Sequence, residues 1–335
     1  MLDLDRIRRI RLSGNPWFQK VVARLLLVPN YYTPPFVRIR LEGQDQLPDS
    51  PVILAMNHTD RYNYWPLQFA LWRRLGRFTA AWVKGKYYEH PLMGLFMELV
   101  NSIPTVSRGY IIARDFRGAL GRRPTNEEYA AARAWVDGQA ARLDGDTVDV
   151  PSGELPGEIL EQPRSILGRE FDPARESYAD AVNALFQEMM RRFVELNAEA
   201  TSLGLDTIIF PQGTRSLRLS RGRIGISQVA LAQERTIVPV GCSGCDKLYP
   251  GGSPWARGGT VTYRFGEPMT HADLKQFHTD AAYEPFTPAA ESAHRETFQA
   301  LADHLMGRID ELVDEPYRFG DDQRSEGVEG SSRFV

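Results

Sequence analysis

Short apolar segments alternate with longer helical patterns along most of the chain, and this alternation restricts the possible folds more than any other feature. Residues 52–56 form a continuous apolar run, which is typical of a buried strand, whereas residues 36–42 alternate between apolar and charged side chains. Further strands are predicted at residues 78–83, 103–107, 207–210, 236–240 and 260–265. Because strands separated by helices pair in parallel, we expect an α/β fold with a central mixed, mostly parallel sheet flanked by helices.

The clearest helical pattern extends from Pro173 to about Ser202. Asp172 suits the N-cap position, and Pro173 suits the first position of the helix. Apolar residues mark one face of this helix at the expected spacing: Tyr178, Val182, Leu185, Phe186, Met189, Phe193 and Leu196. Gly204 is suited to end the helix, because glycine readily adopts the left-handed conformation found there.

Residues 110–172 interrupt the alternation and indicate an insertion of helical and loop character. Thr125 and Glu128 have the spacing of a capping box, which predicts a helix that reaches about Leu143. Residues 144–172 are rich in Asp, Glu, Gly and Pro. The insertion is either a lid or partner surface, or a passive excursion of the chain over the surface.

The composition excludes several classes of protein. Forty basic and 43 acidic residues give a net charge of -3, so charge does not favour a nucleic-acid partner. Two cysteines, Cys242 and Cys245, are too few for a disulfide scaffold, and without a second pair they predict no metal site. No apolar run reaches the roughly 18–20 residues of a membrane-spanning helix, and we expect no signal peptide.

The two ends of the chain carry opposite charge. Residues 1–24 hold six basic and two acidic side chains, a net charge of +4, and Trp17 and Phe18 begin an apolar stretch. We interpret residues 1–30 as a basic amphipathic segment at a membrane surface, or alternatively as an ordinary surface helix docked on the core. Residues 320–335 are predicted to be a disordered acidic tail, which leaves residues 31–319 as the main domain.

Three segments are candidates for a functional site. Asn57-His58-Thr59-Asp60-Arg61-Tyr62-Asn63 follows the strand at 52–56, and Phe210-Pro211-Gln212-Gly213-Thr214-Arg215-Ser216 follows the strand at 207–210. Ligands of α/β folds bind beyond the carboxyl ends of strands, and the second segment has amides and an arginine suited to phosphate. A capped loop and a tight turn are the alternatives. Residues 236–240 support the site from behind, or form an ordinary strand that Pro239 places at an edge or a bulge.

The order and spacing of these segments resemble the PlsC-type glycerolipid acyltransferases, which include 1-acylglycerol-3-phosphate acyltransferases. The first motif of that family is Asn-His followed, after four residues, by Asp; Asn57-His58 matches it, with Asn63 at the acid position. The later motif is Phe-Pro-Glu-Gly-Thr-Arg-Ser, which residues 210–216 match with Gln212 in place of Glu. Residues 83–109 loosely resemble the middle motif, and the resemblance covers about residues 36–110 and 176–268.

The resemblance implies an acyltransferase that needs no metal or cofactor. His58 would be the general base that activates a hydroxyl of a lysophospholipid, such as 1-acylglycerol-3-phosphate, for attack on a thioester of acyl-CoA or acyl carrier protein. The residues that the resemblance assigns to the acceptor are Arg108, Gln212, Gly213, Thr214, Arg215 and Arg223. Such an enzyme would work as a peripheral protein at the cytoplasmic face of a membrane.

The chain departs from the family at two acids, which are replaced by Asn63 and Gln212. Asn63 can accept a hydrogen bond from the His58 ring, but it lacks the negative charge that stabilises an imidazolium. Asp60 is a candidate replacement carboxylate, or alternatively a solvated turn residue. The departures leave two other functions open: a catalytically weak lipid-binding relative, and an acyltransferase with a non-glycerol acceptor.

Overall fold

The structure, a computed structural model, describes residues 1–141 and 155–320. Seven strands form one sheet in the order β1-β9-β8-β2-β7-β3-β4. Their bounds are β1 (Val37–Glu42), β2 (Ile53–Met56), β3 (Thr79–Lys84), β4 (Ser102–Thr105), β7 (Asp206–Ile209), β8 (Ile237–Ser243) and β9 (Gly259–Phe265). The five strands from β8 to β4 are parallel to one another, whereas β9 runs antiparallel to β8 and parallel to β1. All seven predicted strands and the predicted mixed, mostly parallel sheet are confirmed.

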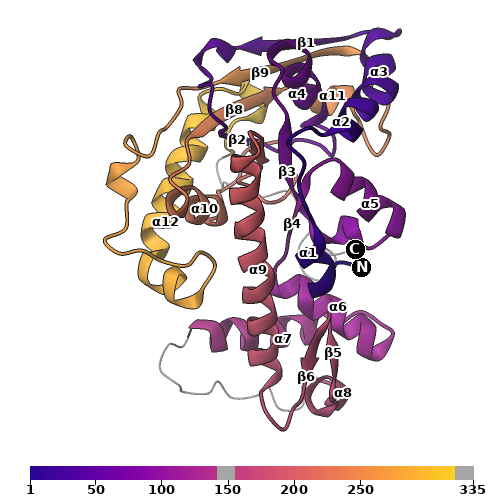
Figure 1. The fold of residues 1–335 in the computed structure, drawn as a ribbon, viewed down its shortest axis with the longest axis vertical. Coiled ribbons are helices and arrows are strands. Elements are labelled where there is room, and N and C mark those ends of the chain that lie inside the picture. The colour runs from indigo at the N-terminus through magenta and orange to yellow at the C-terminus, as the bar shows by residue number, and fades with distance from the viewer. Residues whose placement is uncertain (142–154, 321–335) are drawn as a thin grey trace.

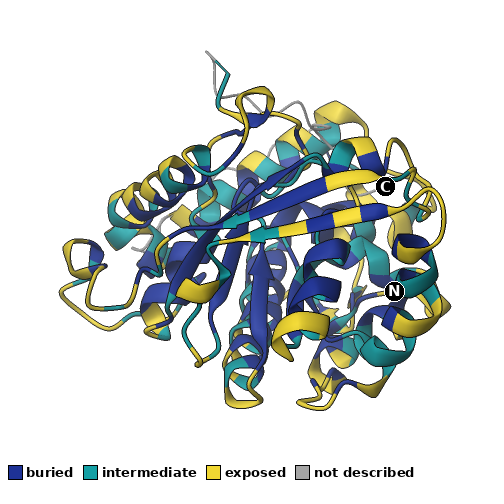
Figure 2. Cartoon of the chain, turned by 90° about the horizontal axis from the view of Figure 1, so that it is seen from above, coloured by how far each residue is buried: buried dark blue, intermediate teal, exposed yellow. Residues whose placement is uncertain are grey.

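Helices cover both faces of this sheet (Figure 1). Val52, Leu54 and Met56 pack with the N-terminal helices and α4, whereas Ile53 and Ala55 pack with α10 and α12 on the opposite face. The strands of the sheet are accordingly dark blue in Figure 2, except for exposed positions on the outer strands. The α-helices are α1 (Leu4–Arg9), α2 (Trp17–Val22), α3 (Val28–Tyr32), α4 (Trp65–Ala70), α5 (Pro91–Leu99), α6 (Arg108–Leu120), α7 (Asn126–Ala141), α8 (Gly157–Glu161), α9 (Tyr178–Ser202), α10 (Gly225–Ala232), α11 (Cys245–Leu248) and α12 (Pro288–Asp310). The π-helical and 3-10 turns are η1 (Ala23–Leu27), η2 (Gln44–Gln46), η3 (Leu71–Leu75), η4 (Gly85–Tyr88), η5 (Lys275–Phe277) and η6 (Glu315–Tyr317).

The long helix α9 begins five residues later than predicted. Asp172 does accept a hydrogen bond from a backbone N–H, that of Ala174 at 3.0 Å, but this bond closes only a local turn. The helix starts after Ser177, whose hydroxyl accepts from the N–H of Asp180. The sequence contains two competent caps in succession, and the second one begins the helix.

The polypeptide between α6 and α9 contributes to the core. The predicted capping box is confirmed: the Thr125 hydroxyl accepts from the Glu128 N–H at 3.2 Å, and the Glu128 carboxylate accepts from the Thr125 N–H at 2.7 Å. Trp135 and Val136 of α7 are buried in the same cluster as α9. The prediction omitted a two-stranded antiparallel sheet of β5 (Arg164–Ile166) and β6 (Arg169–Phe171), because three-residue strands are too short for a periodic pattern. Residues 142–154 of the predicted insertion lie outside the described residues.

Pro239 does not lie in an edge strand, so the expectation of an edge position is wrong. Strand β8 lies between β2 and β9, and the paired run with β9 starts only at Val240. The Ile237 N–H donates to the Met269 carbonyl, on the side of β8 that faces β9. Backbone nitrogens two residues apart in a strand face the same side, so the nitrogen of Pro239 also faces β9. The missing N–H therefore falls where residues 266–268 interrupt the β9 ladder, and no ladder hydrogen bond is lost.

The N-terminal segment docks on the domain but leaves part of its apolar surface in solvent. Leu4 and Ile7 of α1 are buried, as are Ala23 and Leu27 of the π-helical turn. Trp17 and Leu25, in contrast, are 61% and 75% exposed. Within the described ranges, no helix is both long and apolar enough to cross a membrane. Residues 321–335 of the predicted acidic tail lie outside these ranges.

Candidate functional site

The parallel strands bring the predicted motifs to one edge of the sheet. Strands β2, β7, β3 and β4 are consecutive neighbours and parallel, so their carboxyl ends share that edge. The segment from Asn57 to Asn63 follows β2, and the segment from Phe210 to Ser216 follows β7. Lys84 ends β3, beside β7. The site is therefore assembled by topology from segments far apart in the chain.

Hydrogen bonds join the two main loops at His58. The backbone N–H of His58 donates to the side-chain oxygen of Gln212 at 3.0 Å, and its carbonyl accepts from the N–H of Ser216 at 2.9 Å. The imidazole also stacks on the Phe210 ring, with 4.0 Å between ring centroids and 16° between planes. Both the backbone and the ring of His58 are thus held by the loop after β7.

Asn63 orients the His58 ring. Its Oδ1 lies 3.2 Å from Nδ1 of His58, while its Nδ2 donates to the carbonyl of Asn57 at 2.8 Å. Because the Asn63 amide donates to Asn57, its oxygen faces the imidazole, and Nδ1 of His58 carries the proton. Nε2 is then the nitrogen that can accept a proton.

Asn57 fixes the start of this loop against β8. Its Nδ2 donates to the Cys242 carbonyl at 2.9 Å, and its Oδ1 accepts from the Cys242 N–H at 2.7 Å. All of these groups are buried. The two amides, Asn57 and Asn63, therefore form a continuous hydrogen-bonded connection from β8 to the His58 ring.

The surroundings of His58 keep its ring neutral. Burial, together with the positive charges of Arg215 and Lys84, lowers the pKa of His58 to about 3, although the hydrogen bond with Asn63 acts in the opposite direction. A neutral imidazole can accept a proton at neutral pH. The same surroundings disfavour the imidazolium that would result, and Asn63 supplies no charge to offset them.

The structure does not bring Asp60 to the His58 ring. The Asp60 carboxylate accepts from the Tyr62 N–H at 2.8 Å and from the Thr59 hydroxyl at 2.9 Å. In the described part of the chain, no hydrogen bond joins it to His58. Burial raises the pKa of Asp60, which is nevertheless held by its own turn. The geometry favours the turn-residue interpretation over a replacement carboxylate.

Gln212 and Gly213 have internal partners. The Gln212 side chain is buried and donates to the Arg218 carbonyl at 3.2 Å as well as accepting from His58. The Gly213 N–H donates to the Phe210 carbonyl at 2.9 Å, which corrects the expectation that this amide faces a phosphate. Gly213 instead provides the left-handed turn, with φ of 69°. Thr214 is buried beside it.

The three predicted arginines are not in one place. Arg215 is exposed and close enough to His58 to lower its pKa. Arg223 is exposed as well, and its backbone N–H donates to the Pro211 carbonyl at 2.8 Å. Arg108 is buried: its Nε donates to Asn183 of α9 at 2.7 Å, and its guanidinium lies over the Phe186 ring at 4.4 Å. The structure thus commits Arg108 to the helical layer and does not join it to the His58 cluster.

Three further cations, Arg61, Lys84 and Lys86, belong to the site and were not among the residues predicted for it. Lys84 lowers the pKa of His58. Lys86 has its own pKa lowered, first by burial and then by the charges of Arg215 and Arg61. Arg215 and Lys84 act on the ring, and Arg215 and Arg61 act on Lys86; we call Arg61, Lys84, Lys86 and Arg215 the cation cluster. Their positions at the ends of adjacent parallel strands were the available signal.

A small, largely apolar cavity lies beside α4 and is linked to the site through the Tyr64 ring. It has a volume of about 50 Å³ and is lined by residues that include Tyr64, Trp65, Trp72 and Phe96. The Tyr64 ring contacts Phe210 edge-on at 6.2 Å, and Phe210 stacks on His58. Within residues 1–141 and 155–320, no group of His, Cys, Asp or Glu side chains is arranged to hold a metal ion.

No protein-family model matches the chain, and no curated protein is similar to it in sequence. Among solved structures, the chain is similar to the crystal structure of the 1-acyl-sn-glycerophosphate (LPA) acyltransferase PlsC from Thermotoga maritima. That similarity covers 92% of this chain and 79% of the other, with 15% sequence identity and a TM-score of 0.39. Similarity at this level carries no functional argument.

Proposed function

We propose that the protein transfers an acyl group from acyl-CoA or acyl carrier protein to a hydroxyl of a lysophospholipid such as 1-acylglycerol-3-phosphate. One observation carries the proposal: Asn63 holds Nδ1 of His58, which leaves Nε2 as a base inside the cation cluster. A base beside concentrated positive charge suits a hydroxyl substrate that also bears a phosphate.

The reaction follows from these groups. Nε2 of His58 takes the proton of the acceptor hydroxyl while its oxygen attacks the thioester carbonyl. The tetrahedral intermediate collapses, the carbon–sulfur bond breaks, and the thiolate leaves with the proton from the imidazolium. The cation cluster would hold the acceptor phosphate, and the apolar cavity beside Tyr64 would receive the start of an acyl chain.

The amide at position 63 favours a second candidate function. Asn63 orients the ring without stabilising its charged form, so the same site suits a relative that binds an anionic lipid without acylating it. A non-glycerol acceptor is a further alternative, because the absence of two acids makes the site more positive.

A thioester-release assay distinguishes these functions. Wild type, His58→Ala and the control His90→Ala, an exposed histidine, are compared with lysophosphatidic acid and either acyl donor. We expect His58→Ala to lose about 10²–10⁴-fold in rate, since this is the usual contribution of a general base, and His90→Ala to retain it. Equal background rates for all three proteins would contradict acyl transfer to this acceptor, and a panel of other acceptors would then test the remaining alternative.

We further propose that the protein works as a peripheral protein at the cytoplasmic face of a membrane. The exposed Trp17 and Leu25 lie beside Lys20 and Arg24, a combination suited to an anionic interface. We expect Trp17→Gln/Leu25→Gln to weaken sedimentation with phospholipid vesicles by at least roughly tenfold, since two large apolar side chains leave the interface. The control is Leu203→Gln, an exposed leucine after α9; equal binding by all three proteins would refute this orientation.

A further inference from the structure

Helix α5 presents several large apolar side chains to solvent. Leu92, Met93 and Leu95 are 72%, 44% and 50% exposed, whereas the buried residues of this helix are Gly94 and Met97. A surface helix of a globular protein normally turns its long apolar side chains toward the core. The orientation of α5 is therefore the reverse of the usual one.

Helix α1 holds α5 in this orientation through Arg6. The Arg6 Nε donates to the Glu98 carboxylate at 2.7 Å, and its Nη1 donates to the Tyr88 carbonyl at 3.0 Å. The guanidinium passes so close to Gly94 that a β-carbon there would lie 2.4 Å from its Nη2. Gly94 and Glu98 are four residues apart and share one helical face, so the one charged side chain of α5 points into the protein. A rotation that buried Leu92 would break this ion pair.

The exposed side of α5 continues onto α2. The Phe96 ring meets Phe18 edge-on with 5.9 Å between centroids, and Phe18 in turn meets Trp17 at 5.5 Å. The Gln19 side chain of α2 also donates to the Val100 carbonyl, at the end of α5, at 2.7 Å. The two helices lie on the same side of the molecule (Figure 1). Their exposed apolar side chains, which we call the apolar face, are Trp17, Leu92, Met93 and Leu95.

The charge beside the apolar face is positive. Lys86 of the cation cluster lies in η4, the turn that leads into α5, and Arg61 and Arg215 are near enough to lower its pKa. The two carboxylates of residues 85–99 are both paired with arginines, Glu89 with Arg114 at 3.1 Å and Glu98 with Arg6 at 2.7 Å. An apolar face bordered by cations complements an anionic bilayer surface. A second copy of the chain fits less well, because residues 85–99 would offer the cations no unpaired carboxylate.

We propose that α5 is a second membrane contact, which lays the apolar face on an anionic phospholipid bilayer beside the cation cluster. Leu92 and Leu95 would enter the boundary between headgroups and acyl chains, and Lys86 would meet lipid phosphates. The bilayer surface would then lie beside the His58 loops, because the cation cluster borders both. The proposal rests on the membrane association proposed above, to which it adds an element outside the N-terminal segment, and it does not depend on acyl transfer.

Vesicle sedimentation tests this contact. The probes are vesicles of phosphatidylcholine alone and of phosphatidylcholine mixed with phosphatidylglycerol, and we expect tighter binding to the mixed vesicles. Leu92→Gln/Leu95→Gln should weaken that binding by at least roughly tenfold, because two leucine side chains no longer enter the bilayer. The matched control is Ala293→Gln/Ala300→Gln, which adds the same two glutamines at exposed positions of α12, on the opposite side of the molecule (Figure 1).

Three results of this experiment would overturn the proposal. The first is an equal loss in the α12 control. The second is wild-type binding by Leu92→Gln/Leu95→Gln together with weakened binding by Trp17→Gln/Leu25→Gln, which would leave the N-terminal contact standing. The third is a wild-type protein that sediments with neither kind of vesicle, which would overturn the membrane association as well.

A fluorescent label at position 92 tests the contact without relying on affinity. Both native cysteines, Cys242 and Cys245, are buried, so Leu92→Cys provides one accessible thiol for an environment-sensitive fluorophore. We expect its emission to shift to shorter wavelength when mixed vesicles are added, whereas a label on Ser292→Cys, an exposed position of α12, should not respond. No shift at position 92, or an equal shift at both positions, would overturn the proposal. So would a wild-type dimer that Leu92→Gln/Leu95→Gln dissociates while vesicle binding stays intact, because the apolar face would then belong to a second copy.

Discussion

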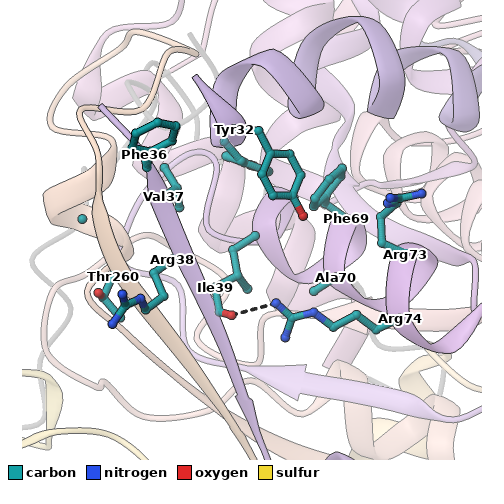
Figure 3. A pocket seen from close by; sticks show the side chains of 12 residues that line it. Tyr32, Phe36, Val37, Arg38, Ile39, Phe69, Ala70, Arg73, Arg74 and Thr260 are labelled. Carbon is teal, nitrogen blue, oxygen red and sulfur yellow. Dashed lines mark hydrogen bonds between the residues drawn. The ribbon is translucent and has the colours of Figure 1, made fainter. Parts of the chain in front are cut away.

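The His58 loops follow the central strands, whereas the groove lined by residues that include Arg38 and Arg73 lies beside the outer strand β1 (Figure 3), and the two regions use their polar groups in opposite ways. Around His58, the amides of Asn57, Asn63 and Gln212 are buried and each has at least two hydrogen-bonding partners. In the groove, Arg38 and Arg73 are exposed and have no ion-pair partner in the described chain. A reacting group needs a fixed geometry, whereas exposed arginines without a carboxylate partner are free to adopt several orientations.

In the His58 loops, the largest expected effect is that of Asn63→Asp on the turnover rate. A carboxylate beside Nδ1 raises the pKa of His58 and stabilises the imidazolium, so we expect turnover to rise roughly tenfold or more. The pH profile gives an independent signature. With a pKa of about 3, wild-type His58 stays neutral from pH 5 to 8, and kcat/KM should show no limb from this base.

In Asn63→Asp the pKa of His58 is raised, so protonation of the base moves to higher pH. The value of kcat/KM should then fall as the pH drops through that pKa. Asn63→Ala is the control, since it removes the hydrogen bond without adding charge. A wild-type limb near pH 6.5 would show that His58 titrates normally and would contradict the neutral, buried ring.

The next largest effect is on the free energy of unfolding, which should differ between variants of the His58 loops and variants of the groove beside β1. Asn57→Ala leaves the buried N–H and carbonyl of Cys242 without partners, so we expect a loss of roughly 2–4 kcal/mol in the free energy of unfolding. Arg38→Gln/Arg73→Gln removes exposed charges with no carboxylate partner, and its change should stay within about 0.5 kcal/mol. Urea unfolding measures both. Similar losses in the two proteins would remove the distinction between a fixed site and an uncommitted groove.

The same distinction explains what the sequence could and could not predict. The seven strands follow from short apolar runs or, at residues 36–42, from the alternation of apolar and charged residues, because both patterns depend on only a few consecutive residues. The shared sheet edge also follows, since parallel strands align their carboxyl ends. The direction of Arg108 does not follow: its place after β4 suggests the site, but packing against Phe186 and a hydrogen bond to Asn183 turn it into the helical layer.

The groove could not have been predicted from the sequence for a related reason. Its arginines come from β1 and from the turn after α4, and neither segment has a motif. Strand β1 meets α4 only because β9 reverses direction next to β8 and carries β1 to the outside of the sheet. Residues brought together by strand order alone leave no pattern of spacing in the chain.

The smallest effect is expected from Asp60→Asn, which tests whether the fixed site contains a hidden acid. Asparagine can still accept from the Tyr62 N–H, and as a neutral side chain it avoids the cost of burying a charge, the cost that raises the pKa of Asp60. We therefore expect turnover to remain within about twofold of wild type, because among the residues that the structure describes no hydrogen bond joins this carboxylate to the ring. Thioester release measures the change, with Asp246→Asn as a control for a nearby carboxylate. A loss comparable with that of His58→Ala would mean that Asp60 supplies the charge missing at position 63, and the orienting role of Asn63 would then have to be shared with it.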